Sequence, residues 1–466
     1  MLTLDFVLAR TPLVAFLTIF ICFFVIYIRC KPNASRDHGV ESPSPSPEKK
    51  PEQNPLGYPP VTPLPSFNWE TTEPLVFRPF KPKFHLTMGE LSLSSLSNLQ
   101  PQISEGIITN KITAISHLDL SDLIPMDKTY LSRLSLREKL LAEHPDVVRG
   151  VNIHSHNSIK NEKIREALYE WYAYVMGTYL PERYPTMFRL VDHLGTGNVK
   201  SEKRRRMMIE SLVTGLKAPV DPEDLMQFCP TNIKDGDETA RTKTQLLYLL
   251  DTLGSWIDED FLILLPSPVP PPLSEDHSSE SDPELKTQYH LEAYTTYYPA
   301  GFDTRKKLSL SLSAIHSPLP GYKQKLSKSM DRFFERLEVG KAVVRVNWSI
   351  MPKGTGLFAA FGGLHNHSPN TEGGNEKEEK LNPDSFDGED TFLRCERQTL
   401  HRLPNSKALL FAFHTYTYPI TDVKEEGLGE ELAIAIDGLK EGSVPEIHEY
   451  KNGPYWGEAV KAFLRS

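Results

Sequence analysis

Apolar side chains recur at helical spacing in two long stretches of the chain. Leucines alternate with basic residues over 128–143, and Ile164, Leu168 and Trp171 begin a second amphipathic series that runs to residue 179. Pro181 follows and is expected to end this helix, because proline lacks the backbone N–H that a helix interior needs. Further helices are predicted in the first part of 246–265 and over 322–337, 430–439 and 454–464.

Strand-like patterns dominate the second half of the chain. They are rich in β-branched and aromatic residues, and a looser alternation precedes them at 107–118. The predicted strands cover the end of 246–265, then 289–298, 342–349, 391–402 and 409–418. Helices come first and strands second, without a βαβ rhythm. The predicted fold class is therefore α+β with an antiparallel sheet and flanking helices.

The first 67 residues have a different pattern. After a short tail, 1–10, residues 11–28 are apolar and uncharged, which is long enough to cross a bilayer core of about 30 Å. We interpret 11–28 as a transmembrane helix rather than a signal peptide, because no small-residue cleavage site follows. Basic residues just after it place the rest of the chain on the cytosolic side. The Pro/Ser-rich residues 29–67 are predicted to be a disordered linker.

Composition excludes several classes of function. A net charge of −9 leaves no strong basic patch, so nucleic acid is not an expected partner. The four cysteines form no C-x-x-C pair, so neither a zinc ribbon, nor an iron–sulfur ligand set, nor a disulfide framework is indicated. There is no P-loop and no dinucleotide fingerprint. His154 and His156 lie in a polar loop without a third ligand nearby, which favours a surface loop over a metal site.

The run 308–322 places His316 at the end of an apolar stretch, just before Pro318, Pro320 and Gly321. As a strand, the run would put His316 on its leucine face; as a helix, it would put His316 at the edge of an apolar arc. Both interpretations direct the imidazole inward, and the prolines stiffen the backbone behind it. Such a histidine suits an axial ligand to a flat cofactor such as haem. The alternative is a core histidine that hydrogen-bonds to a carbonyl.

Four arginines lie on predicted strands rather than in loops. An arginine that faces the interior from a strand needs an anionic partner. The carboxylates of a haem would serve, because guanidinium binds carboxylate bidentately. The alternative is an ion pair within the protein, for which Glu396, Asp390 and Asp260 are candidates. The four are Arg345, Arg394, Arg397 and Arg402.

Several blocks, in this order, resemble the haem-dependent oxidative N-demethylase family in its catalytic alpha subunit. The most specific are KLSLSLSAIHSPLPGY and FLRCERQTLHRLPNSKALLFAFHTY; SWIDEDFLILLP and RPFKPKFHLTMG precede them. The resemblance covers residues 75–445 and leaves 446–466 as a C-terminal helix. It implies a haem b in a PAS-like antiparallel sheet. It also implies oxygen-dependent removal of an N-methyl group from a small amine, with release of formaldehyde and with electrons from NADPH through flavin and iron–sulfur modules.

The resemblance makes His316 the candidate iron ligand and catalytic residue. The contacts of Arg345, Arg394, Arg397 and Arg402 with haem carboxylates are our proposal from their chemistry. His414 stands where the family commonly has an arginine, which makes it a second candidate for the haem pocket.

The predicted protein is a membrane-tethered, haem-dependent monooxygenase of a small amine or related metabolite. Because the chain has no iron–sulfur ligand set and no nucleotide fingerprint, its electrons must come from a separate, NADPH-linked protein. The alternative is a PAS-like haem-binding sensor or carrier that turns nothing over.

Overall fold

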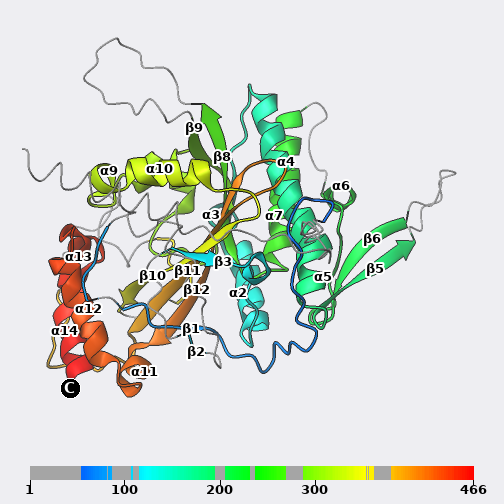
Figure 1. Cartoon of the computed structure of the whole chain (residues 1–466). Helices are drawn as coiled ribbons and strands as arrows, with labels where there is room; N and C mark the ends of the chain where they lie inside the picture. The colour runs from blue at the N-terminus through cyan, green and yellow to red at the C-terminus, as the bar shows by residue number, and fades with distance from the viewer. Residues whose placement is uncertain are drawn as a thin grey trace, which may run out of the picture. The chain divides into compact units, whose positions relative to one another are not determined.

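An antiparallel sheet of seven strands organises the folded part of the chain, as a computed structural model shows (Figure 1). The strand order is β3-β10-β11-β12-β8-β9-β4. The bounds are β3 (Ser116–Leu118), β4 (Arg149–Val151), β8 (Asp260–Pro268), β9 (Thr287–Thr295), β10 (Ala342–Met351), β11 (Phe392–Arg402) and β12 (Leu409–Pro419). The structure describes residues 54–80, 82–86, 107–108, 115–194, 205–230, 237–268, 287–352, 354, 356–361 and 379–466.

The three central strands pair along their whole lengths. β10 runs against β11 from Ala342, opposite His401, to Met351, opposite Phe392. β11 and β12 form a hairpin whose turn is closed by the Leu403 N–H, which donates to the Ala408 carbonyl at 2.9 Å. These are the predicted strands 342–349, 391–402 and 409–418, and their pairing confirms the antiparallel sheet.

The sheet has two chemically different faces, because successive side chains on a strand point to opposite sides. We call the first the α10 face. Its apolar part packs against α8 (Leu312–His316) and α10 (Ser327–Arg336) and consists of Leu262, Leu264, Leu291, Val343, Leu400, Leu409 and Phe413.

We call the opposite side the α4 face. It is covered at one end by α4 (Ser158–Tyr174) and α7 (Glu238–Gly254), and at the other by α12 (Gly429–Glu441) and α14 (Gly453–Arg465). Figure 1 shows α10 and the α12–α14 group against different parts of this sheet.

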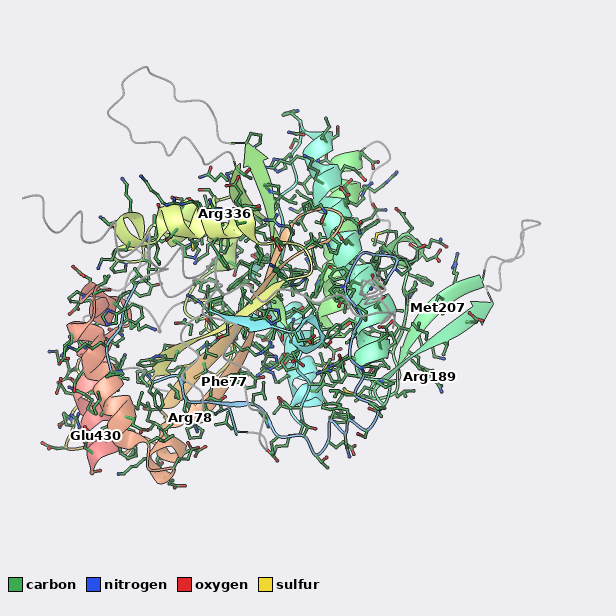
Figure 2. The ribbon with its side chains drawn as sticks, viewed as in Figure 1. Phe77, Arg78, Arg189, Met207, Arg336 and Glu430 are labelled. Carbon is green, nitrogen blue, oxygen red and sulfur yellow. The ribbon has the colours of Figure 1, made fainter. Side chains whose placement is uncertain are left out.

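Short elements connect these layers. The helical ones are η3 (Leu120–Asp122), α2 (Tyr130–Glu143), α3 (Pro145–Val148), α5 (Leu180–Arg183), α6 (Pro222–Leu225), η5 (Met226–Phe228), η6 (Thr304–Lys307), α9 (Tyr322–Lys325), α11 (Ile420–Glu425) and α13 (Glu446–Tyr450). β1 (Val76–Phe77) pairs with β2 (Ile107–Ile108). A separate three-stranded sheet contains β5 (Phe188–Leu194), β6 (Arg205–Ser211) and β7 (Lys217–Pro219). Arg189 and Met207 mark its β5–β6 hairpin in Figure 2.

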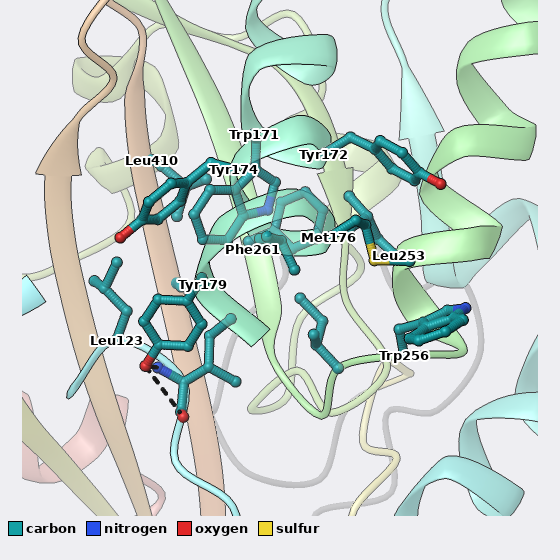
Figure 3. Close-up of a cluster of buried hydrophobic side chains, with 14 of the residues drawn as sticks. Leu123, Trp171, Tyr172, Tyr174, Met176, Tyr179, Leu253, Trp256, Phe261 and Leu410 are labelled. Atoms are coloured by element: carbon teal, nitrogen blue, oxygen red, sulfur yellow. Dashed lines mark hydrogen bonds between the residues drawn. The ribbon is translucent and has the colours of Figure 1, made fainter. Parts of the chain in front are cut away.

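The helix predicted to stop at Pro181 instead continues through it. Five residues, Val175–Tyr179, form a π-helical turn (η4), and the Leu180 N–H donates to the Val175 carbonyl. Pro181 then lies in the first turn of α5, where its missing N–H does little harm. Figure 3 shows Trp171, Tyr174 and Tyr179 of this continuous rod in the core beside Phe261. The rod thus brings a row of aromatic side chains under the α4 face.

The predicted fold class is correct in one part and wrong in another. The α+β architecture with an antiparallel sheet is confirmed, whereas its PAS-like character stays a prediction. The transmembrane helix is not supported: no helix within the described ranges is long and apolar enough to cross a bilayer. The longest, α4 and α7, have 17 residues each and carry charged side chains. Residues 11–28 themselves lie outside the described residues.

The folded part also begins earlier in the chain than the sequence predicted. Residues 54–67, predicted to belong to the linker, pack against the domain: Tyr58 and Val61 are buried in the core. The Tyr58 ring stacks on Tyr174 with 3.5 Å between centroids, and the Leu64 N–H donates to the Arg183 carbonyl at 2.8 Å. The proline content of this segment suggested disorder, but its spaced aromatic and aliphatic side chains are buried.

Candidate functional site

His316 lies at the end of the short helix α8, on the α10 face. The Ser311 hydroxyl caps this helix by accepting from the Ala314 N–H at 3.2 Å. Nδ1 of His316 is 2.8 Å from the Leu312 carbonyl oxygen, and because a carbonyl only accepts, Nδ1 carries the proton. No described residue hydrogen-bonds to Nε2. The ring therefore presents an unshared nitrogen lone pair, the form in which imidazole binds a metal.

The turn after His316 fixes the direction of the ring. The Leu319 N–H donates to the His316 carbonyl at 2.9 Å, and Gly321 has a φ of 71°. A side chain at Gly321 would also come within 2.9 Å of Val444. The turn brings Tyr322 back over the imidazole, with 5.4 Å between the ring centroids and an angle of 23° between the planes. The Pro-x-Pro-Gly sequence thus holds the histidine in place, as expected.

Burial keeps the His316 imidazole neutral. Burial lowers its pKa to about 4, and the positive charges of Lys307 and Arg345 act in the same direction. Lys307 lies at the end of η6 with its Nζ 4.1 Å from the Phe302 ring centroid. Burial lowers the pKa of this ammonium group to about 8. At neutral pH the ring is therefore uncharged, with two cationic groups near it.

Lys307 and Arg345 are the cationic neighbours of His316, and we call the three side chains the His316 cluster. Arg345 is exposed, and His316 and Lys307 are half-exposed. The Arg345 Nε–H donates to Gln398 Oε1 at 2.7 Å, and its terminal nitrogens have no partner among the described residues.

The other predicted arginines are already used by the protein itself. Arg394 donates to the carbonyls of Tyr298 at 2.6 Å and Leu357 at 3.1 Å. Arg402 donates to the carbonyls of Leu337 at 2.7 Å and Phe334 at 2.5 Å. Their bonds tie loops to the sheet, and neither the ion pairs nor the free guanidinium groups that the sequence suggested are found at these positions.

Arg397 and His414 lie on the α4 face, opposite to His316. Arg397 donates to the Asp122 and Leu123 carbonyls at 2.5 and 3.3 Å. His414 is directly opposite Arg397 on β12 and lies between two carboxylates, with Nε2 3.4 Å from Asp258 and Nδ1 3.4 Å from Glu259. Burial holds its pKa well below the usual range. The sheet therefore separates these two residues from His316.

Sequence reasoning missed Lys307, Tyr322 and Gln398 as members of the site. Lys307 belongs to a 3-10 turn, for which the sequence carries no periodic signal. Gln398 could have been found, because strand parity puts it on one face with Arg394. The predicted surface position of His154 is consistent with its half-exposed ring, 3.2 Å from Glu292. Within the described residues, no group of three or more His, Cys, Asp or Glu side chains is arranged to hold a metal ion.

The chemistry of the His316 cluster fits a haem. His316 offers an unprotonated ring nitrogen for iron, and Lys307 and Arg345 offer free cationic ends for the two carboxylates. Apolar side chains of the α10 face, among them Ile315, Phe333 and Phe413, are of the kind that covers a porphyrin.

Residues 114–461 match the family described as "Haem-dependent oxidative N-demethylase, alpha subunit-like". The match covers more than half of the chain. It includes the complete seven-stranded sheet and the helices on both of its faces, and it reaches into the C-terminal helix α14. The chain therefore belongs to the family of proteins that resemble the alpha subunit of haem-dependent oxidative N-demethylase.

Proposed function

We propose that the protein is a haem-dependent oxidoreductase that removes an N-methyl group from a small amine. Family membership supports haem dependence and the oxidative removal of an N-methyl group. The observation that carries the proposal to this chain is His316, whose Nδ1–H is held by the Leu312 carbonyl and whose Nε2 has no partner among the described residues. When bound, haem b supplies the oxygen binding and one-electron chemistry that no side chain can supply.

The residues of the His316 cluster would bind and orient this cofactor. His316 would hold the iron, while the Leu312 carbonyl keeps the proton on Nδ1 and increases the basicity of the ring. Lys307 and Arg345 would neutralise the haem carboxylates. The apolar side chains of the α10 face exclude water from the reacting centre, which prevents side reactions of reactive intermediates.

The overall reaction balances with an external electron donor. One N-methylated amine, one O₂, two electrons and two protons give the demethylated amine, formaldehyde and water. The described residues include no iron–sulfur ligand set. We therefore propose that a separate, NADPH-linked electron-transfer protein supplies the electrons.

Two measurements on the purified chain with added haem test the proposal. A Soret absorption band is expected on haem uptake, and reduction in air with an N-methylated amine should release formaldehyde. A Soret band with stable CO binding and no formaldehyde from any methylated amine would favour a sensor or carrier instead. A colourless protein after haem addition would contradict haem binding altogether.

A further inference from the structure

A row of basic side chains runs along the solvent-facing side of α10. Lys328, Arg332 and Arg336 are spaced four residues apart, so they lie one above the other on a single face of this helix. Lys328 and Arg336 are exposed, and Arg332 is half-exposed. Figure 2 shows Arg336 on α10. We call these three side chains the α10 row.

Two members of the α10 row lack an acidic partner. Arg332 donates through Nε to the Lys328 carbonyl at 3.2 Å, and neither Arg332 nor Arg336 forms an ion pair with a described carboxylate. The nearby carboxylate of Glu338 is taken by Lys341 at 2.7 Å. Like charges four residues apart repel one another and destabilise a helix. The row therefore concentrates positive charge without compensation by the described carboxylates.

The surrounding sequence strengthens this charge. Residues 322–337 contain five lysines and arginines against two carboxylates, which gives them a net charge of +3. The whole chain has a net charge of −9. The surface of α9 and α10 is thus a basic region on an acidic protein.

The inner side of the same helices covers the layer that holds His316. Phe333 and Phe334 of α10 pack in the apolar cluster of the α10 face, together with Ile315, the residue before the histidine. The preceding helix, α9, carries Tyr322, whose ring stacks on the His316 imidazole with 5.4 Å between centroids. One helical layer therefore has the α10 row on its outer side and the proposed iron ligand on its inner side.

The proposed function needs a surface on which a separate electron donor can dock. Exposed basic side chains attract an acidic protein and steer its approach, whereas they repel a basic one. At physiological salt the Debye length is about 8 Å, so a docked carboxylate interacts with the α10 row more than with the net charge of the whole chain. The local charge of the row therefore selects an acidic donor.

We propose that the α10 row is the docking surface for an acidic electron-transfer protein. The proposal rests on the function proposed above and adds where its electron donor binds. Carboxylates of the partner pair with Arg332 and Arg336, because guanidinium binds carboxylate bidentately. Each encounter passes one electron to the haem, which oxidises the carrier and reduces the haem. Two encounters supply the two electrons of the proposed reaction.

Binding of an oxidised carrier to the haem-loaded full chain tests the proposal without any turnover. The probe is a plant-type [2Fe–2S] ferredoxin, an acidic one-electron carrier, and biolayer interferometry measures its affinity. Ferredoxin should bind the unaltered chain, and added salt should weaken this binding because exposed charges are screened. The double variant Arg332→Glu, Arg336→Glu should weaken it by at least about tenfold, because like charges then face each other.

A matched variant separates docking from a general effect of charge. Lys163→Glu, Lys243→Glu makes the same change of charge at exposed positions of α4 and α7, which cover the other face of the sheet. It should leave ferredoxin affinity unchanged. In stopped-flow measurements, reduction of the haem by reduced ferredoxin should slow by at least about tenfold in the variant of the α10 row. Reduction by dithionite, which needs no docking surface, should keep its rate.

The possible results distinguish this proposal from the proposed function. Equal ferredoxin affinities of the unaltered chain and the variant of the α10 row, with a normal Soret band in both, would overturn the docking surface alone. So would a lack of ferredoxin binding to the unaltered chain. Binding of vesicles of equal parts phosphatidylserine and phosphatidylcholine through the row, without ferredoxin binding, would assign the row to a lipid surface instead. A colourless unaltered chain would overturn the proposed function, and ferredoxin affinity would then decide the docking surface separately.

Discussion

A carbonyl oxygen one helical turn earlier decides which nitrogen of the His316 ring is free. The Leu312 carbonyl holds the proton on Nδ1, so Nε2 keeps its lone pair. Tyr322 stacks on the ring and limits its rotation. A core histidine bonded to a carbonyl would show the same Nδ1 contact. The lack of a partner for Nε2 among the described residues is what the proposed role as iron ligand requires.

Replacement of His316 by alanine is expected to abolish or shift the Soret band of the haem-loaded protein. The reason is loss of the imidazole nitrogen that would hold the iron. The measurement is an absorption spectrum after haem addition and desalting. His156→Ala, in an exposed loop, is the control and should keep the full band. A normal spectrum in His316→Ala would contradict the assignment of His316 as the iron ligand.

The lowered pKa of His316 predicts how coordination depends on pH. The pKa is about 4 in the folded protein against an ordinary value of 6.5, so the ring stays neutral well below pH 6. The Soret band of the haem-loaded protein should therefore persist unchanged at pH 5. The unfolded chain takes up this proton already near pH 6.5. The stability that the neutral ring contributes is therefore present above that pH and lost between about 6.5 and 4.

Denaturant titrations at several pH values check the stability part of this prediction. Each such histidine steepens the pH dependence by at most about 1.4 kcal/mol per pH unit. His401 adds to it, because burial lowers its pKa to about 3. The double variant His316→Gln, His401→Gln should flatten the curve below pH 6.5. A slope identical to that of the unaltered chain would show that neither histidine stays neutral in the fold.

At the scale of elements, α12 and the segment 82–86 depend on two glycines for their close approach. The Phe84 N–H donates to the Gly438 carbonyl at 3.0 Å, and the Ser443 N–H donates to the Phe84 carbonyl at 2.9 Å. A Cβ atom at Gly438 would collide with the Pro82 carbonyl, and one at Gly442 with the Phe84 carbonyl. Backbone atoms cannot move aside as a flexible side chain can.

Gly438→Ala is therefore expected to destabilise the protein although alanine favours helix. Overpacking of this kind costs about 1–3 kcal/mol in the free energy of unfolding. Urea denaturation measures the change, and Glu431→Ala on the exposed side of the same helix provides the comparison. If both variants were equally stable, the segment 82–86 would not pack on α12 in solution.

At the scale of the whole molecule, residues 54–67 pack against the aromatic core and connect elements that are far apart in the sequence. Tyr58 is 1 % exposed and stacks on Tyr174, which itself belongs to the rod of α4, η4 and α5. Asn405, in the β11–β12 turn, donates to the Leu56 carbonyl at 3.0 Å. The segment thus connects the sheet hairpin with the helical layer.

Tyr58→Ala should lower the free energy of unfolding by about 3 kcal/mol, because it leaves a large cavity under the segment. The Tyr58 hydroxyl is buried without a hydrogen-bond partner, so Tyr58→Phe should cost nothing or be slightly stabilising. Chemical denaturation of both variants tests the pair. Equal losses in the two would assign the stability to the hydroxyl and contradict the stacking argument.

Periodicity in the sequence was enough to find the long helices and strands, since α2, α7 and β10–β12 each bury a continuous apolar face. Periodicity failed at Pro181, because a π-helical turn places this proline in the first turn of α5, where no backbone N–H is needed. It also failed at 54–67, because the buried side chains there follow no regular spacing. The sequence predicted that Arg397 lies on a strand but not which face of the sheet it occupies. Arg397 is three residues from Arg394, so the two side chains point to opposite faces. Contacts such as that of Lys307 with Phe302 depend on tertiary structure alone.

The two-faced sheet has a consequence for how the protein tolerates change. Along β11, Arg394, Glu396 and Gln398 look toward one layer, and Cys395, Arg397 and Thr399 look toward the other. A complete substitution scan of this strand should show sensitivity with a period of two. Every second position should affect ligand handling while the protein stays folded, and the positions between should affect solubility and yield first. Evolution could thus alter what one layer binds without rebuilding the layer behind it.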